Sequence, residues 1–322
     1  MKTMLGKISV LLVIVVFLEI GLTIFLKTPG EIKELNECLK RKADVIYFGD
    51  STISNSAKDD SDKRSIVSML QDQLPQLKIC CIQGSSYNMD VYLSFCRYIL
   101  KQKYRPKVLI IPINMRSFSP EWDMRPEYQF EKLKVFLDGS IFLKILYRPL
   151  SVLKCNLYGV RQDQFKNTPV FNGDMPVGRV KDFEQSIYGG CKDYSAAGAR
   201  KVFLYLYMYS LKERHRKIQS MLGIAKIMKQ SGTKVIFYIT PIDYETGEKY
   251  LPAQFLKRLD SNTRLIASLL SIEGVDLLDI SKGLGAASFN YPFPCISEHM
   301  NESGRRYVAQ RLADEIEKIS CF

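Results

Sequence analysis

Short apolar runs alternate with longer amphipathic segments along most of the chain. The apolar runs are typical of β-strands, and they cover residues 43–49, 78–84, 106–114, 233–240 and 275–281. Apolar residues recur at helical spacing in other segments, which are 63–74, 89–102, 199–230, 252–270 and 302–319. Strands that alternate with helices predict a parallel sheet covered by helices on both faces. We therefore expect a flavodoxin-like, three-layer α/β/α fold with a mostly parallel five-stranded sheet.

The first part of the chain has a different pattern. Residues 8–26 are apolar apart from Glu19, and a helix of this length can cross a hydrocarbon core of about 30 Å. No cleavage site of small residues follows, so we interpret residues 1–27 as an uncleaved membrane anchor and residues 28–42 as a stalk with a short helix. Lysine and arginine residues flank both ends of the apolar run, so the positive-inside rule alone does not decide its orientation.

Residues 115–198 interrupt the alternation of strands and helices. This segment holds many aromatic residues, stretches with Gly and Pro, and Trp122, the single tryptophan. We interpret it as an insertion over the carboxyl edge of the sheet, within a domain of residues 43–322. Such an insertion could be a lid or a glycan-binding wall, or it could be a structural cap.

The chain is basic, with 46 Lys and Arg residues against 34 Asp and Glu residues and a net charge of +12. This charge favours acidic partners such as anionic lipid, nucleic acid or acidic glycans. The densest basic run, residues 212–217, lies in a helical pattern and is interpreted as a solvated helix face. Because no nucleic-acid motif accompanies it, we expect no nucleic-acid partner. The 8 cysteines show no zinc spacing, so they are buried small residues or members of disulfides, and no metal is expected.

Candidate chemistry lies at the ends of the predicted strands. Ligand sites in open parallel sheets form outside the carboxyl ends of the strands, and this rule selects Ser51, Gly84 and Asn114. A serine hydroxyl is a weak nucleophile unless a base takes its proton. Of the 2 histidines, His215 lies in the basic helix face, whereas His299 follows the last strand at the same edge as Ser51. Ser51 and His299 are therefore the candidate nucleophile and base.

The same edge supplies candidate donors for an oxyanion, which acyl transfer requires. Gly84 can offer a backbone N–H because no side chain blocks the approach of a substrate. Asn114 can offer its side-chain amide, and Ser51 its own backbone N–H. Asp50 is interpreted as a residue that shapes the turn.

Four short motifs that carry these residues resemble the blocks of the SGNH/GDSL hydrolases. They are "FGDST" with Ser51, "IQGSS" with Gly84, "IPINMRS" with Asn114 and "EHMNESG" with His299. The resemblance implies the SGNH hydrolase fold, a Ser51 nucleophile, a His299 base and an oxyanion hole of Ser51, Gly84 and Asn114, without a cofactor.

The resemblance also implies a place of action and a substrate class. Members of this family with one N-terminal anchor and a large insertion often add or remove acyl groups, commonly acetyl, on surface polysaccharide outside the membrane. It therefore implies an extracytoplasmic catalytic domain and a polysaccharide or other acylated carbohydrate as substrate. A membrane protein that donates the acyl group is a possible further partner.

Two positions depart from the pattern of that family. The Asp that usually precedes the His by three residues, and orients it, is replaced by Ile296. Glu298 is the expected substitute, and Asp279 or a backbone carbonyl are the alternatives. The third block also lacks its usual Gly and Asp around Asn114.

Three classes of function follow from these residues. The first is a membrane-anchored esterase or O-acyltransferase that works through an acyl-serine at Ser51. The second is a non-catalytic protein of the same fold that binds glycan or an assembly partner, which the replacement by Ile296 supports. The third is a metal or phosphate site at Asp50, which the lack of a Walker lysine motif and of a histidine-rich cluster disfavours.

Overall fold

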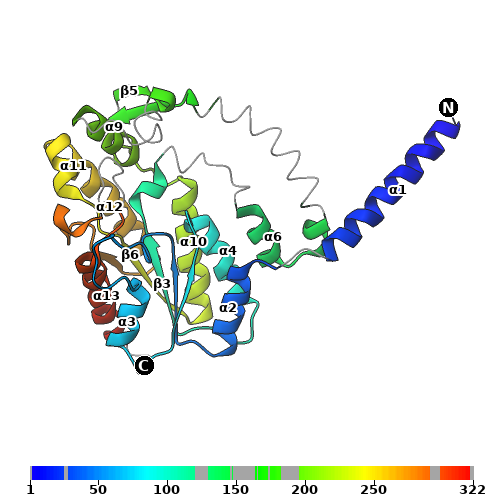
Figure 1. Ribbon diagram of the computed structural model, residues 1–322, viewed down its shortest axis with the longest axis horizontal. Helices are drawn as coiled ribbons and strands as arrows, with labels where there is room; N and C mark the ends of the chain where they lie inside the picture. Colours follow the sequence, from blue (N-terminus) through cyan, green and yellow to red (C-terminus); the bar gives the residue numbers. More distant parts are fainter. Residues whose placement is uncertain are drawn as a thin grey trace.

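A five-stranded parallel sheet forms the centre of the molecule (Figure 1). The computed structural model describes residues 2–24, 28–119, 130–145, 147, 164, 166–172, 175–182, 196–290 and 298–319. The strands are β1 (Val45–Gly49), β2 (Ile79–Gln83), β3 (Val108–Ile113), β6 (Lys234–Ile239) and β7 (Leu277–Asp279). They pair in the order β2-β1-β3-β6-β7, and every pair is parallel. This is the flavodoxin-like strand order, and the predicted fold is confirmed.

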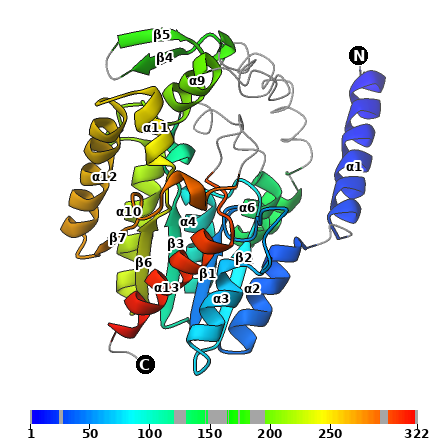
Figure 2. The ribbon, with the colours of Figure 1, turned by 60° about the vertical axis from the view of Figure 1, so that its left-hand side comes forward.

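Helices cover both faces of the sheet and complete the three layers. One face carries α2 (Gly30–Lys40), α4 (Met89–Leu100), α10 (Arg216–Ser231) and α12 (Phe255–Ile272). The other face carries α3 (Ile66–Gln73) and α13 (Glu302–Glu317), which Figure 2 shows in front of β1 and β3. Successive side chains of β1 point to opposite faces of the sheet. Ile46 and Phe48 therefore pack on the first face, and Val45 and Tyr47 pack on the second.

The short helix predicted within residues 28–42 is α2, and it belongs to the helical layer of the domain instead of standing apart as a stalk. Ile32, Leu35 and Leu39 are buried in the core next to the sheet. At the start of the helix, the Tyr87 hydroxyl donates to the Glu31 carboxylate at 3.0 Å. The three apolar positions recur at helical spacing, so the segment forms an amphipathic helix that must bury its apolar face.

The N-terminal helix α1 (Lys2–Ile24) makes no part of this core (Figure 1). Its window Met4–Gly21 has a mean hydropathy of 2.3, and 0% of that window is buried. By length and composition, α1 is a candidate for a signal anchor or a membrane span.

The single helix expected over residues 199–230 is in fact two helices. α9 (Ala196–Tyr207) ends before a turn, and His215 caps the start of α10 by accepting the Lys217 N–H on Nδ1 at 3.2 Å. Lys217 itself is fully buried, and its ammonium donates to the Ser117 carbonyl. The interpretation of residues 212–217 as one solvated helix face is therefore wrong for Lys217. A short helix that was not predicted, α11 (Tyr244–Tyr250), precedes α12.

The predicted insertion contributes several described elements beyond the carboxyl ends of the strands. They are the 3₁₀ turn η1 (Met115–Phe118), α6 (Glu131–Asp138), the antiparallel hairpin of β4 (Pro169–Asn172) and β5 (Met175–Arg179), and the start of α9. α6 packs against α2 and α4, and α9 packs against β4, α11 and η1. A second 3₁₀ turn, η3 (Ala286–Ser288), precedes α13. Trp122 and Ile296 lie outside the described residues.

The described cysteines carry free thiols, and they are Cys38, Cys80, Cys81 and Cys96. Cys38 of α2 and Cys80 of β2 share a hydrogen bond, which lowers the pKa of the Cys80 thiol to about 7. Complete burial raises the pKa of Cys96 above its ordinary value. The reading of these cysteines as small packed residues fits this part of the chain.

Candidate active site

A tight turn after β1 presents Ser51 at the carboxyl edge of the sheet. The carboxylate of Asp50 accepts the Thr52 N–H at 2.8 Å, which closes the turn as expected for a short acidic side chain. A Cβ on Gly49 would lie 1.5 Å from the end of the Ile53 side chain, so a larger residue here would force the buried Ile53 to move. Ser51 therefore follows a buried strand in a tight turn, with its side chain half-buried.

The structure brings Ser51 and His299 together, as the sequence predicts. Ser51 Oγ lies 3.0 Å from His299 Nε2, although 248 positions separate the two residues. His299 precedes α13, and its carbonyl accepts the Asn290 N–H at 2.7 Å. Asn301 then caps the start of α13 by accepting the Gly304 N–H at 3.2 Å. The imidazole is thus positioned by a loop that is fastened on both sides.

Asn55 is a site residue that sequence reasoning missed. Its Nδ2 lies 2.8 Å from the same Nε2 atom of His299. A neutral imidazole nitrogen either accepts one hydrogen bond or donates one, so Ser51 and Asn55 compete for it. The amide can also present its carbonyl oxygen, which suits a protonated Nε2. The signal that could have identified Asn55 is its place four residues after Ser51, in the same turn.

Burial lowers the pKa of His299 to about 4, and the nearby positive charge of Arg116 adds to this effect. The carboxylate of Asp50 acts in the opposite direction and raises it. The ring is therefore neutral at neutral pH, as a base that accepts a proton must be. The low pKa also makes the ring a weaker base than an ordinary histidine.

Glu298 lies beside His299 in sequence but faces away from it. Its carboxylate is buried and accepts the Tyr207 hydroxyl at 2.9 Å and the Thr240 hydroxyl at 3.2 Å. Burial raises its pKa to about 7, against the opposing effect of Arg116. The structure thus places Glu298 as an anchor between the histidine loop, α9 and the end of β6.

Asp279, the second candidate for orienting His299, is engaged in another turn. The carboxylate of Asp279 accepts the Ser281 N–H at 3.0 Å, which closes the turn after β7. Ile296 lies outside the described residues. Within the described part of the chain, both hydrogen bonds of the His299 ring are made at Nε2.

The three predicted oxyanion donors differ in their availability. Asn114 Nδ2 donates to the Asp50 carboxylate at 3.2 Å, and because this group carries two N–H bonds, one remains for a substrate. The Ser51 N–H donates to no group among the described residues. The Gly84 N–H, however, donates to the Gly49 carbonyl at 3.2 Å, which continues the β1–β2 ladder. A role for Gly84 as a donor requires that this hydrogen bond be shared or broken.

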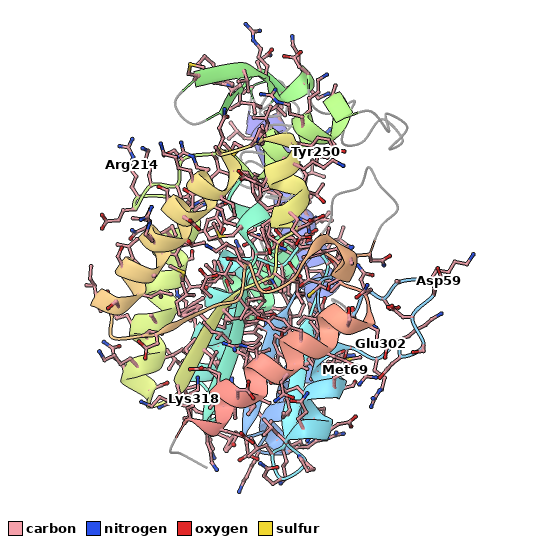
Figure 3. The ribbon with its side chains drawn as sticks, turned by 90° about the vertical axis from the view of Figure 1, so that its left-hand side faces the viewer. Asp59, Met69, Arg214, Tyr250, Glu302 and Lys318 are labelled. Carbon is pink, nitrogen blue, oxygen red and sulfur yellow. The ribbon has the colours of Figure 1, made fainter. Side chains whose placement is uncertain are left out.

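Arg305, on the first turn of α13, fastens the loops that carry the two candidate catalytic residues. Its side chain is completely buried and pairs with Asp60 at 2.8 Å. The guanidinium also donates to the carbonyls of Asn55 and Met300, which flank Ser51 and His299 in sequence. Figure 3 shows Glu302, at the start of α13, beside the loop that carries Asp59. The spacing of Ser51 and His299 thus depends on a buried cation that the sequence did not single out.

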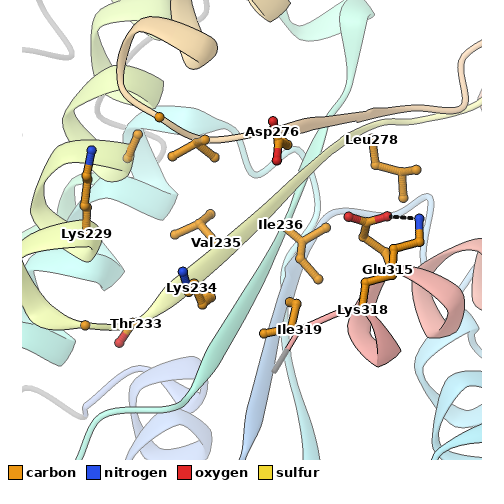
Figure 4. Close-up of a pocket in the computed structure, with 14 residues that line it drawn as sticks. Lys229, Thr233, Lys234, Val235, Ile236, Asp276, Leu278, Glu315, Lys318 and Ile319 are labelled. Carbon is orange, nitrogen blue, oxygen red and sulfur yellow. Dashed lines mark hydrogen bonds and ion pairs between the residues drawn. The ribbon is translucent and has the colours of Figure 1, made fainter. Parts of the chain in front are cut away.

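The described residues contain no group of three or more His, Cys, Asp or Glu side chains that could hold a metal ion. A hollow of about 490 Å³ lies near the amino end of β6, and Figure 4 shows that Lys234, Asp276 and Glu315 line it. It is at the edge of the sheet opposite to Ser51, because all five strands are parallel. The candidate active site is therefore separate from this hollow.

No known family profile matches the chain, and no curated protein matches it. Solved structures with a similar fold include an acetylxylan esterase mutant from Geobacillus stearothermophilus, with a TM-score of 0.42, 13% identity, and coverage of 85% of this chain and 94% of that chain. A GDSL-like lipase from Bacteroides thetaiotaomicron has a TM-score of 0.40 and 11% identity over 92% and 94%. A salicylyl-acyltransferase from a tetracycline biosynthetic pathway has a TM-score of 0.40 and 12% identity over 87% and 55%. At identities this low, the similarity concerns the fold alone.

Proposed function

We propose that this protein is a serine esterase or O-acyltransferase that works on acylated cell-surface polysaccharide, with acetyl as the expected group. The observation that carries the proposal is the 3.0 Å contact between Ser51 Oγ and a neutral His299 Nε2. A neutral ring nitrogen at this distance can take the serine proton as the nucleophile attacks. We also propose that α1 anchors the protein in a membrane with the domain at the outer surface. The length and apolar composition of α1 support this part of the proposal.

The reaction follows from the atoms at the site. The Ser51 hydroxyl gives its proton to Nε2 while Oγ bonds to the ester carbonyl carbon, whose oxygen becomes an oxyanion. The proposed donors to that oxyanion are the Ser51 N–H and the second N–H of the Asn114 amide, whose first N–H is bound by Asp50. When the ester C–O bond breaks, the leaving alcohol takes the proton back from His299. Attack by water on the acyl-serine then gives hydrolysis, and attack by a sugar hydroxyl gives acyl transfer.

Covalent labelling and turnover test this proposal together. We expect the full chain in detergent to hydrolyse a soluble acetyl ester and to be labelled by a fluorophosphonate probe at Ser51. Ser51→Ala should abolish both, whereas Ser54→Ala, at an exposed serine of the same turn, should leave both unchanged. Equal turnover and labelling in the wild type and Ser51→Ala would refute the assignment.

A non-catalytic role in binding glycan or an assembly partner is the second candidate. The observation that favours it is that no carboxylate among the described residues contacts the His299 ring, and that Asn55 shares Nε2 with Ser51. A folded protein that binds an acetylated glycan, but whose Ser51 resists the fluorophosphonate probe, would support this role.

A further inference from the structure

Three consecutive apolar side chains project into solvent directly after α6. Ile141 is 58% exposed, Phe142 is 75% exposed and Leu143 is 38% exposed. Outside α1, the other exposed large apolar side chains of the described residues are Met175, Val177 and Ile272, and no three of them are consecutive. Isolated exposed apolar residues are ordinary, but a contiguous group indicates a contact surface.

The backbone holds this group in a defined conformation. Gly139 ends α6 in the left-handed region, with φ of 80°. Ser140 then starts a new helical turn, because its carbonyl accepts the Lys144 N–H at 3.1 Å and its hydroxyl accepts the Leu143 N–H at 3.4 Å. The apolar side chains are therefore presented outward by a folded turn.

Basic side chains lie on the elements that adjoin the apolar group. A groove of about 680 Å³ between α4, α6 and α10 is lined by four basic side chains, Arg97, Lys101, Lys134 and Arg216, against two acidic ones, Asp90 and Asp138, and Arg216 is paired with Asp90. Next to it, the Lys144 ammonium lies 5.1 Å from the centre of the Phe136 ring. Apolar side chains flanked by lysine and arginine are typical of segments that lie in the interface of an anionic bilayer.

The surface also lies close to where the candidate membrane helix joins the domain. α1 ends at Ile24 and α2 begins at Gly30, and the residues between them span at most roughly 20 Å when extended. α6 packs directly against α2, and Figures 1 and 2 both show α6 on the side of the domain from which α1 leaves. A short tether of this kind raises the effective concentration of a nearby lipid surface, so a small apolar group is enough to bind it.

We propose that Ile141, Phe142 and Leu143, with the basic groove beside them, dock the domain onto an anionic lipid surface. The apolar side chains enter the boundary between headgroups and acyl chains, and the lysine and arginine side chains reach lipid phosphates. Docking holds the domain in one orientation, where the short linker alone would let it swing. This inference rests on the proposed membrane insertion of α1, and it does not depend on catalysis by Ser51.

Tryptophan fluorescence in vesicles tests the docking directly. The full chain would be reconstituted into vesicles that contain phosphatidylglycerol with brominated acyl chains. Quenching of tryptophan fluorescence would then be measured for Phe142→Trp and Ile272→Trp. Because the wild type contains Trp122, each variant is compared with the wild type, and only the added signal is counted. Ile272 is the matched control because it is 79% exposed at the end of α12, far from α6. We expect at least twofold quenching of the added signal in Phe142→Trp and none in Ile272→Trp. The quenching should weaken in vesicles made only of phosphatidylcholine with the same brominated acyl chains. It should also weaken in the anionic vesicles when Arg97→Glu and Lys134→Glu are combined.

Each other outcome overturns the proposal in a distinguishable way. If the chain resists extraction by alkaline carbonate but Phe142→Trp is quenched no more than Ile272→Trp, α1 is inserted and the surface does not bind lipid. That result would assign the surface to a protein partner instead. If carbonate removes the chain, both the membrane anchoring and the docking are wrong. Hydrolysis of a soluble ester by the same samples reports on Ser51 separately.

Discussion

Replacing Arg305 tests how much a buried ion pair contributes to the stability of this domain. The side chain is 0% exposed and its partner Asp60 is 7% exposed. Besides this ion pair, the guanidinium donates to four backbone carbonyls, those of Asn55, Asp62, Arg64 and Met300. Arg305→Met removes the cation and its donors but keeps most of the apolar bulk.

The magnitude follows from what remains after the substitution. Removing one partner of a buried ion pair costs about 3–5 kcal/mol, because the other charge stays buried without its counterion. Asp60 keeps two backbone donors, the N–H groups of Ala57 at 2.7 Å and of Glu302 at 3.0 Å. We therefore expect the lower end of the range, a loss of about 3 kcal/mol in the free energy of unfolding.

Urea unfolding of the full chain in detergent, followed by near-ultraviolet circular dichroism, measures this loss. Arg306→Met is the matched control, because Arg306 is the next residue of α13, pairs with Asp62 and Glu302, and is 51% exposed. Exposed ion pairs contribute little, so the control should unfold close to the wild type. Equal losses in the two variants would show that burial of the Arg305 pair does not set its contribution.

Two further predictions concern the chemistry of the edge. Because burial lowers the pKa of His299 to about 4, the ring loses its capacity as a base only when the pH falls through about 4. The value of kcat/KM for a soluble acetyl ester should therefore be flat from pH 5 to 7. A midpoint near 6.5, the ordinary pKa of histidine, would contradict the assigned environment. A Cβ on Gly84 would lie 2.3 Å from the buried Tyr87 ring, so Gly84→Ala should lower the free energy of unfolding by about 1–3 kcal/mol, measured by urea unfolding. Since Ala keeps the N–H, a stable Gly84→Ala variant with a much reduced kcat would show that the backbone at this position must move to bind the oxyanion.

The sequence was sufficient for the parallel five-stranded sheet and for the meeting of Ser51 with His299. Both depend on local signals, because an apolar run followed by a small or polar residue marks a strand end, and parallel strands share one carboxyl edge. The histidine was identifiable because only 2 exist in the chain. The short helix expected within residues 28–42 forms as α2, but its packing in the core was not predicted, because helical spacing alone does not show which surface Ile32, Leu35 and Leu39 contact.

The hydrogen-bond partners of Asn55 and Arg305 could not be predicted from the sequence, although the place of Asn55 in the turn of Ser51 marks it as a neighbour of the site. Asn55 meets His299 across 244 positions, and Arg305 meets Asp60 across 245. Such contacts depend on the path of irregular loops, which periodicity does not describe. Their residue types also gave no warning, because Asn in a turn and Arg on a helix are most often solvated.

The position of Glu298 shows why adjacency in sequence is a poor guide to the carboxylate that orients a histidine. Successive side chains of an extended segment point to opposite sides, so a residue next to His299 that packs inward cannot also reach the ring that faces Ser51. The carboxylate instead binds Tyr207 and Thr240. The negative charge that favours the protonated ring therefore comes from Asp50, in the turn that carries Ser51, the proposed nucleophile. Because Asp50 also accepts a hydrogen bond from the Asn114 amide, one carboxylate interacts with both the proposed base and a proposed oxyanion donor.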